Sequence, residues 1–452
     1  MSPIDAVQVH ETTLQILERI GVRLEHDGIV ERMLKAGARP GSRAQEVKFP
    51  ASMVREYLAL APSTVELTGV DGTPSRLSPA GAPLFWTCPV LRVWNGTVSR
   101  EATSSDLAAI GRLASHLENV QGVMGVALAD IPPLCRDFVG VRILAENTRR
   151  HIRALCFSGR GMEALAEMRP LLPGNWFSIG FTAHGPLRWT NLALEVFLRS
   201  SGHAIPTTIN GEPMAGVTGP VTPAGTIAVG NAEILAGIIV NQILEPGRPV
   251  IYNLGLAHVF DMKHATAVTG GPENAFFAEA AAALGRYYRL PSSSWVSTEA
   301  LFEDEQAALE KMFGFLTHTN AGVSLIWGVG QLESQMTLSL AQMVIDDEIL
   351  NYLARYRRGF AVDPDTLALD LTEQMGIAGN YLESDHTLEH FRANLFQPKI
   401  LNRRPRTVNS VPLERAAAAE VSRHLTGEAS SHLPADIAVE LRRIERRFSE
   451  SG

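Results

Sequence analysis

The sequence predicts an α/β protein, a (β/α)8 TIM-type barrel with an N-terminal α-rich cap and a C-terminal helical tail. The first observation is that, from about residue 120, short apolar runs alternate with longer stretches in which apolar residues recur at helical spacing. Strands separated by helix-sized crossovers form a parallel sheet, and eight such strands close most economically as a barrel. The second observation is the length, since 452 residues accommodate one barrel and an added N-terminal piece. A doubly wound open sheet is the alternative, but no Gly-x-Gly-x-x-Gly motif follows a predicted strand.

Residues 1–100 are expected to form a helical cap followed by a loop region. Apolar residues at helical spacing predict helices from Val7 to Ile20, over about 28–35 and over about 52–60, the last capped by Ser52. Residues 69–100 are rich in Gly, Pro and Ser, which is typical of loops with short strands. The barrel itself is expected over 101–404, and a charged helical tail that packs on it over 405–452.

Eight apolar runs are predicted as the barrel strands: Val120–Leu128, Ile152–Phe157, Trp176–Phe181, Ile205–Ile209, Val250–Leu254, Ser294–Ser297, Val323–Val329 and Ile377–Leu382. The helices between them include Leu192–Ser200, Ala224–Leu244, Asn274–Tyr288, Glu303–Thr317 and Thr337–Arg355. Because the loops after the strands form the active face of such a barrel, polar residues just beyond each run are candidates for the site. These are His184, Asn210, Glu212, Asn253, His258, Glu299, Asp304, Gln331, Asp385 and His386.

Composition argues against two classes of protein, those that bind nucleic acids and those that are secreted with disulfide bonds. A net charge of −8 argues against a nucleic-acid surface, because phosphate binding needs clustered Lys and Arg. Three scattered cysteines form neither a disulfide framework nor a Cys-x-x-Cys motif, which fits a reducing cytoplasm. The first residues lack the charged start and apolar core of a secretory signal. We therefore expect a cytoplasmic protein without nucleic-acid or membrane partners, and a homo-oligomer, as apolar helices in barrels of this size often support assembly.

The segment from Gly216 to Glu233 combines turn formers, a helix start and buried polar residues. Thr222 precedes Pro223 and is expected to cap a helix that runs to Leu244. That helix approaches the length of a membrane span, but its Glu and two Asn would make a bilayer costly, so burial in the protein is expected. A buried Glu233 must find partners or face a cavity. The segment is expected to support the site through Gly216, Thr218, Pro220, Thr222, Gly225, Asn231 and Glu233.

Several motifs, in this order, resemble the trimethylamine methyltransferase family: Gly96 to Arg100 with Thr103 and Asp106, Gly216 to Gly225 followed by Asn231-Ala232-Glu233, Pro246 to Tyr252, Asp304 to Glu310, and His386 to Arg392. The resemblance covers nearly the whole chain. It implies a methyltransferase that moves a methyl group from a methylated amine to the Co(I) of a corrinoid carried by a separate partner protein. No cofactor bound tightly by this chain itself is implied.

The resemblance also bears on the substrate. Family members that act on trimethylamine carry pyrrolysine within the chain, and none occurs here. A quaternary ammonium already carries a neutral leaving group, so it needs no general acid and no such residue. A betaine-like quaternary or tertiary amine is therefore implied, although the loop residues His184, Gly185 and Arg149 depart from the family pattern.

An ammonium substrate needs aromatic faces and, for a betaine, donors for its carboxylate. Trp295 and Trp327 are the preferred pair for the cage, with core packing as the ordinary alternative for each. The other residues predicted to contact substrate are Tyr252, Phe260, Tyr381, Glu212, Asn253 and Glu299; Trp176 is a further aromatic candidate. The predicted catalytic residues are His386, Asp304 and Gln306. The ordinary alternatives are that His386 is a structural hydrogen-bond donor and that Asp304 and its neighbours complement the dipole at a helix N-terminus. Glu310 shares a helical face with Gln306.

Two other functions remain open at this stage. A barrel that keeps the cation cage could bind an amine as a sensor or scaffold without transferring a methyl group. A metal-dependent barrel hydrolase would need clustered ligands, for which His258, Asp261 and His264 are a weak signal, so no metal ligands are predicted.

Overall fold

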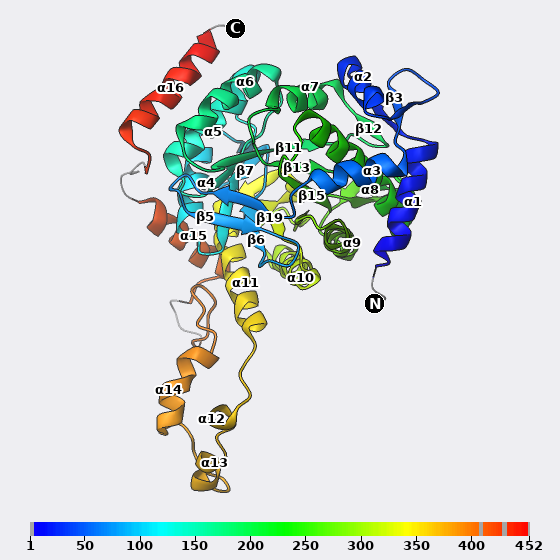
Figure 1. Cartoon of the computed structure of the whole chain (residues 1–452). Helices are drawn as coiled ribbons and strands as arrows, with labels where there is room; N and C mark the ends of the chain where they lie inside the picture. The colour runs from blue at the N-terminus through cyan, green and yellow to red at the C-terminus, as the bar shows by residue number, and fades with distance from the viewer. Residues whose placement is uncertain (1–3, 406–409, 427–431, 451–452) are drawn as a thin grey trace.

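A computed structural model of the protein describes residues 4–405, 410–426 and 432–450 (Figure 1). Its centre is a closed barrel of eight parallel strands, in the order β10-β11-β13-β15-β18-β19-β6-β9. The strands are β6 (Leu84–Thr87), β9 (Val120–Met124), β10 (His151–Arg153), β11 (Phe177–Thr182), β13 (Thr207–Asn210), β15 (Val250–Gly255), β18 (Ser292–Trp295) and β19 (Leu325–Val329). The predicted fold class is confirmed.

A helix follows each barrel strand and covers the outside of the barrel. These helices are α4 (Ser104–His116), α5 (Arg136–Asn147), α6 (Gly159–Met168), α7 (Asn191–Ser200), α8 (Pro223–Leu244), α9 (Pro272–Tyr288), α10 (Glu305–Ala321) and α11 (Leu340–Arg358). Alternate strand residues such as Ile152, Ile179 and Ile209 join the apolar core between strands and helices. Their neighbours in sequence therefore face the interior of the barrel, since side chains alternate along a strand.

One predicted strand is wrong and one was missed. Residues Ile377–Leu382 form no strand, and both of these end residues are exposed. The barrel instead takes its first strand from Leu84–Thr87, inside the range expected for the N-terminal loop region, and β6 closes the sheet between β19 and β9. An apolar run shows only that its side chains could be buried. Ile377–Leu382 is such a run, but no other layer of the described chain packs against it.

The N-terminal region packs on one flank of the barrel and on its bottom. Helices α1 (Ala6–Arg19) and α3 (Ala51–Leu60) contact α8, and α2 spans Asp27–Lys35. Ser52 does not cap α3, because the helix begins at Ala51 with Pro50 at its N-cap. The strands β1 (Val22–Leu24), β2 (Arg39–Pro40) and β3 (Glu46–Lys48) form a small sheet with β12 (Arg188–Trp189). The hairpin of β4 (Val65–Thr68) and β5 (Pro74–Leu77) closes the amino end of the barrel.

Helix α8 is a core helix. It is long and apolar enough to cross a membrane by length and composition, but 83% of that window is buried inside the protein. Asn231 explains how the helix tolerates polar residues: its Nδ2 donates to Thr13 Oγ1 (2.9 Å) and Tyr288 Oη (2.7 Å), and its Oδ1 accepts from Tyr252 Oη (2.8 Å). These bonds join the N-terminal region, α8, α9 and the outer face of β15.

Two further parts follow α11. Residues 359–395, called the arm below, project away from the barrel and carry α12 (Pro364–Leu367), α13 (Leu369–Met375) and α14 (Asp385–Asn394) (Figure 1, orange). The chain then returns: helix α15 (Leu413–Leu425) packs against α11 and α4, and α16 (Ala435–Glu450) packs against α5 and α6. Residues 406–409 and 427–431 of the region expected as the tail lie outside the described residues.

Candidate active site

The interior of the barrel is closed at the bottom and polar toward its mouth. Trp86, on β6, stacks on the His151 ring with centroids 5.2 Å apart, and His151 Nδ1 lies 3.1 Å from the Thr68 carbonyl of the closing hairpin. The opposite ring nitrogen lies 2.9 Å from Ser178 Oγ. Burial lowers the pKa of His151 to about 4, so this floor is uncharged at neutral pH.

Trp295 and Trp327 lie side by side on the barrel wall. They are register partners on the neighbouring strands β18 and β19, and both belong to the apolar cluster inside the barrel. They are 2% and 3% exposed, yet neither indole N–H has a hydrogen-bond partner among the described residues. The N–H group of a buried tryptophan usually has a hydrogen-bond acceptor. The pair therefore offers two aromatic surfaces and two unused donors within the barrel.

Arg153 is a charged residue inside the barrel that the sequence prediction missed. It ends β10 and is only 4% exposed. Its Nη1 donates to the Ala154 carbonyl (2.6 Å), whereas its Nε has no partner. Burial lowers the pKa of Arg153 to about 9, and no carboxylate forms an ion pair with it in the part of the chain that the structure describes.

A chain of amides lies on the wall between these two features. Asn253 Nδ2 donates to Asn210 Oδ1 (2.8 Å), and Asn210 Nδ2 donates to Thr182 Oγ1 (3.0 Å). Asn253 Oδ1, Thr208 Oγ1 and Ser293 Oγ are buried without a partner in the described residues. Buried polar atoms are nearly always paired, so several unpaired ones on one interior surface indicate a space for water or a polar ligand.

Two carboxyl groups adjoin the mouth, the half-buried Glu212 and the buried Glu233. Glu212 follows β13, and Glu233 on α8 accepts a hydrogen bond from the Leu187 N–H (2.8 Å) through Oε1 while its Oε2 has no partner in the described chain. Burial raises the pKa of each to about 7, and for Glu233 the nearby Glu212 raises it further. The pair is thus largely protonated below neutral pH and would gain negative charge beside a bound cation.

The predicted residues Glu299 and Gln331 tie the rim loops together. Glu299 Oε1 accepts from the Thr269 N–H (2.6 Å) and from the Gly270 N–H (2.8 Å). Gln331 Nε2 donates to Ser297 Oγ (3.0 Å). These bonds join the loops after β15, β18 and β19, so both side chains hold the mouth in shape.

Asp304 and Gln306 lie at the start of α10, away from the interior of the barrel. Asp304 Oδ1 accepts from the N–H groups of Gln306 (3.0 Å) and Ala307 (3.1 Å), which is an N-cap. The exposed Gln306 donates through Nε2 to Glu310 Oε1 (3.0 Å), and Glu310 Oε2 accepts from the Glu299 N–H (2.9 Å).

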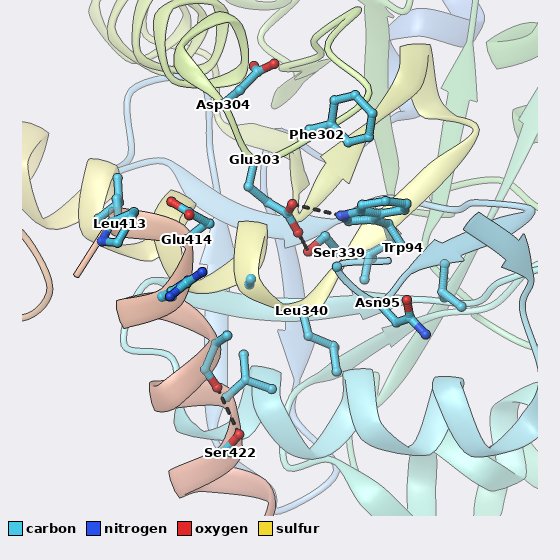
Figure 2. Close-up of a pocket in the computed structure, with 18 of the residues that line it drawn as sticks. Trp94, Asn95, Phe302, Glu303, Asp304, Ser339, Leu340, Leu413, Glu414 and Ser422 are labelled. Carbon is cyan, nitrogen blue, oxygen red and sulfur yellow. Dashed lines mark hydrogen bonds between the residues drawn. The ribbon is translucent and has the colours of Figure 1, made fainter. Parts of the chain in front are cut away.

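Asp304 also lines a cavity of about 1070 Å³ outside the barrel, between the starts of α4, α10 and α11 and helix α15 (Figure 2). There the Glu303 carboxylate accepts from Trp94 Nε1 (2.9 Å) and from Ser339 Oγ. The residues that line this cavity come from rim loops, helices and the small sheet of β7 (Arg92–Trp94), β8 (Ser99–Glu101), β20 (Gln331–Leu332) and β21 (Thr337–Ser339).

The expected position of His386 is wrong. It was placed at the barrel mouth on the strength of the strand Ile377–Leu382, which does not exist. His386 and Asp385 lie in α14 of the arm, where His386 Nε2 is 3.3 Å from the Asp365 carbonyl and its ring meets His390 at 4.3 Å. Tyr381 is also in the arm and is 40% exposed.

Other predicted contacts lie outside the interior. Tyr252 faces α8 through its bond to Asn231, and Trp176 Nε1 donates to the Arg169 carbonyl. Phe260 lies on β16 (His258–Asp261), in a small sheet with β14 (Met214–Ala215) and β17 (Thr266–Val268). His184 is exposed beside the mouth.

The segment predicted to support the site forms the loop from β13 to α8. Thr218 Oγ1 accepts from the Met214 N–H (2.7 Å), and Thr226 Oγ1 donates to the Pro220 carbonyl (2.5 Å). Thr222 is the N-cap residue of α8, but its side chain makes no capping bond, contrary to the prediction. Gly216 has φ +91°, and a Cβ at Gly225 would lie 2.8 Å from Pro220 Cβ, so both glycines are required by the loop.

The three residues weighed as metal ligands do not converge. His258 Nδ1 lies 3.0 Å from the Leu256 carbonyl, and Asp261 pairs with the exposed His264 at 2.5 Å. The described residues contain no group of three or more His, Cys, Asp or Glu side chains that could hold a metal ion.

The whole chain, residues 1–452, matches the family described as trimethylamine methyltransferase. The chain belongs to this family. It is 30% identical over 461 residues to the trimethylamine methyltransferase of Desulfitobacterium hafniense strain DSM 10664 / DCB-2, covering 96% of this chain and 91% of that protein. It is 28% identical over 425 residues to the glycine betaine methyltransferase of Desulfitobacterium hafniense strain Y51, covering 88% and 86%.

A solved structure agrees on the fold. The monomethylamine methyltransferase of Methanosarcina barkeri matches with a TM-score of 0.52 and 11% identity, covering 100% of this chain and 93% of that chain. The match over residues 1–452 confirms the predicted family, and a trimethylamine methyltransferase (30%) and a glycine betaine methyltransferase (28%) are about equally similar to this chain.

Proposed function

We propose that the protein transfers a methyl group from a quaternary or tertiary methylated amine of the betaine type to the Co(I) of a corrinoid carried by a partner protein. The single observation that carries the proposal is the Trp295–Trp327 pair inside the barrel, with two unpartnered indole N–H groups. Methylated ammonium groups bind over indole faces, because the ring quadrupole attracts the cation without requiring a hydrogen bond from it.

The chain's residues position the substrate and need not move a proton. The C–N bond breaks with its electron pair staying on nitrogen, so a quaternary ammonium leaves as a neutral amine. The corrinoid would supply the Co(I) nucleophile that forms the new bond to the methyl carbon. The indole walls would hold the N-methyl group toward the mouth and exclude water from it, which is the contribution expected of positioning. Asn253 and Glu212 would line the mouth beside the substrate.

The exposed apolar residues of the mouth support docking of a corrinoid protein at that end. Loops that follow the barrel strands carry large exposed apolar side chains: Leu91, Val98, Leu134, Phe157, Val217, Val221, Met262, Leu301, Phe302 and Met336. Apolar residues gathered at one end of a soluble molecule are typical of an interaction site. A cytoplasmic location and assembly into a homo-oligomer remain predictions.

The test is incubation of the purified chain with Co(I) cobalamin and a panel of methylated amines, following the cobalamin absorbance. We expect methylation with one betaine-type amine and none with the same amine lacking N-methyl groups. Binding of an amine by calorimetry without any methylation, in the presence of free cobalamin and of candidate corrinoid proteins, would favour an amine-binding barrel that serves as a sensor or scaffold.

A further inference from the structure

The interior of the barrel carries a positive wall opposite its aromatic wall. In the closed order of strands, β10 is four positions from β18 and β11 is four positions from β19. Strands four apart in an eight-stranded barrel face each other across the interior. Arg153 on β10 and Gly180 on β11 therefore lie across from Trp295 and Trp327.

The chain makes room for the Arg153 guanidinium. A Cβ at Gly180 would collide with Arg153 Nη2, so the guanidinium lies over the one residue of β11 that has no side chain. Gly180 and Thr182 are only half-buried although they belong to a barrel strand, so this part of the interior is reached from the mouth. Arg153 Nη1 is held by the Ala154 carbonyl, Nη2 lies over Gly180, and the unpartnered Nε is buried.

The charge of Arg153 is not neutralised by the protein. Arg248, another fully buried arginine, donates to the Ile205 carbonyl (2.8 Å) and to Ser200 Oγ (3.0 Å) and lies 3.7 Å from Glu245. Arg153 donates only to the neighbouring Ala154 carbonyl, its Nε is unpartnered, and no described carboxylate pairs with it. A buried cation without a counter-ion is costly, and a visiting anion would remove that cost.

We propose that Arg153 binds the carboxylate of the substrate, which makes the substrate a zwitterion whose methylated ammonium lies against Trp295 and Trp327. This inference rests on the proposed function and assigns the residue that selects among methylated amines. A guanidinium offers a carboxylate two parallel N–H donors, whereas a methylated amine without an acidic group gains nothing from it.

The decisive experiment compares two probes that share the trimethylammonium group: glycine betaine, which has a free carboxylate, and its methyl ester, in which that carboxylate is capped and uncharged. Calorimetry on the full chain should show the betaine binding at least about 30-fold more tightly than the ester, since losing one partner of a buried charged pair costs about 2 kcal/mol or more. Arg153→Gln should bring that ratio close to one by weakening the betaine alone. Gly180→Ala, which displaces the guanidinium without removing its charge, should reduce the ratio in the same direction.

Arg248→Gln is the matched control, because it removes a buried arginine outside the interior. It should lower the unfolding temperature and leave the ratio of the two probes unchanged. Equal binding of betaine and ester by the wild type, or an unchanged ratio in a folded Arg153→Gln or Gly180→Ala variant, would overturn the assignment while leaving the ammonium site intact. Failure of the wild type to bind either probe or choline would overturn the proposed function together with it.

Discussion

The interior of the barrel and the arm differ in opposite ways from the usual pattern of polar groups outside and apolar groups inside. The interior buries polar atoms that the protein leaves unpaired, such as Arg153 Nε and the indole N–H groups of Trp295 and Trp327. No residue of the arm is buried, yet it exposes large apolar side chains: Phe360, Val362, Leu367, Leu369, Ile377, Tyr381, Leu382, Leu388, Phe391 and Leu395. Unpaired buried polar atoms fit a small polar ligand, whereas exposed apolar side chains fit a macromolecular surface. The two regions therefore suit different contacts: a small polar ligand in the interior, and another macromolecule on the arm.

The strongest effect should come from the support behind the aromatic wall. Lys311 Nζ lies 3.0 Å from Asp346 Oδ2 and also donates to the Gly328 carbonyl, directly after Trp327, and both charged side chains are fully buried. Lys311→Met leaves the buried Asp346 carboxylate without a counter-charge, and we expect a loss of about 3–5 kcal/mol in the free energy of unfolding, measured in urea. Lys35→Met, at the exposed pair with Glu31, should cost under about 1 kcal/mol. Equal losses in both variants would contradict the prediction.

The largest effect on ligand binding should come from the aromatic wall itself. Trp327→Leu removes one indole face from the interior, and we expect about 30-fold weaker binding of glycine betaine by calorimetry, since a desolvated cation–π contact contributes about 2 kcal/mol. Trp176→Leu removes a fully buried tryptophan whose N–H bonds to Arg169, outside the interior. That control should lose stability and keep its affinity for betaine. Retained affinity in a folded Trp327→Leu variant would remove the aromatic pair from the site.

The carboxyl pair at the mouth should make stability depend on pH. The pKa of Glu233 is raised to about 7, above its ordinary value of 4.5, so the native state holds a proton that the unfolded chain releases. This contribution is complete below pH 4.5 and is lost as the pH rises through about 7. Glu233→Gln should remove the part of the slope that Glu233 contributes, about 2–3 kcal/mol in the free energy of unfolding between pH 4.5 and 7.5 in urea titrations, and leave the part due to Glu212. Glu440→Gln, a control at a surface ion pair with Arg443, should leave the slope between pH 4.5 and 7.5 in place.

The fold was largely predictable because seven of the predicted segments overlap barrel strands and are separated by helices. The eighth strand, Leu84–Thr87, is four residues long and lies in a stretch rich in Pro and Gly, although Leu84-Phe85-Trp86 between two prolines was a usable signal. In its place Ile377–Leu382 was chosen, because sequence polarity does not reveal whether a segment has anything to pack against. Because His386 was placed by this wrong strand, it was expected at the mouth, whereas it lies in α14 of the arm.

The site was only partly predictable for a related reason. Trp295 and Trp327 were predicted as a pair because each lies in a proposed strand, and the structure places them side by side on β18 and β19, while their role in binding stays a prediction. Arg153 was not predicted, because the candidate residues lie beyond the ends of the strands and Arg153 lies within one. A charged residue in a run predicted to be buried was itself a signal, since burying a charge has to be compensated. Its lack of a partner could be seen only once all eight strands were placed.

The smallest effect should come from removing the arm. Its two ends are close, because Arg355 donates through Nη1 to the Gly359 carbonyl (2.9 Å) and through Nη2 to the Asn394 carbonyl (2.7 Å). A four-residue Gly-Ser linker in place of residues 361–393 should therefore join them without strain. Since no removed residue is buried, we expect the free energy of unfolding to change by less than about 1 kcal/mol and betaine affinity to stay within twofold. A large loss of affinity would show that the arm, His386 included, acts on the interior of the barrel after all.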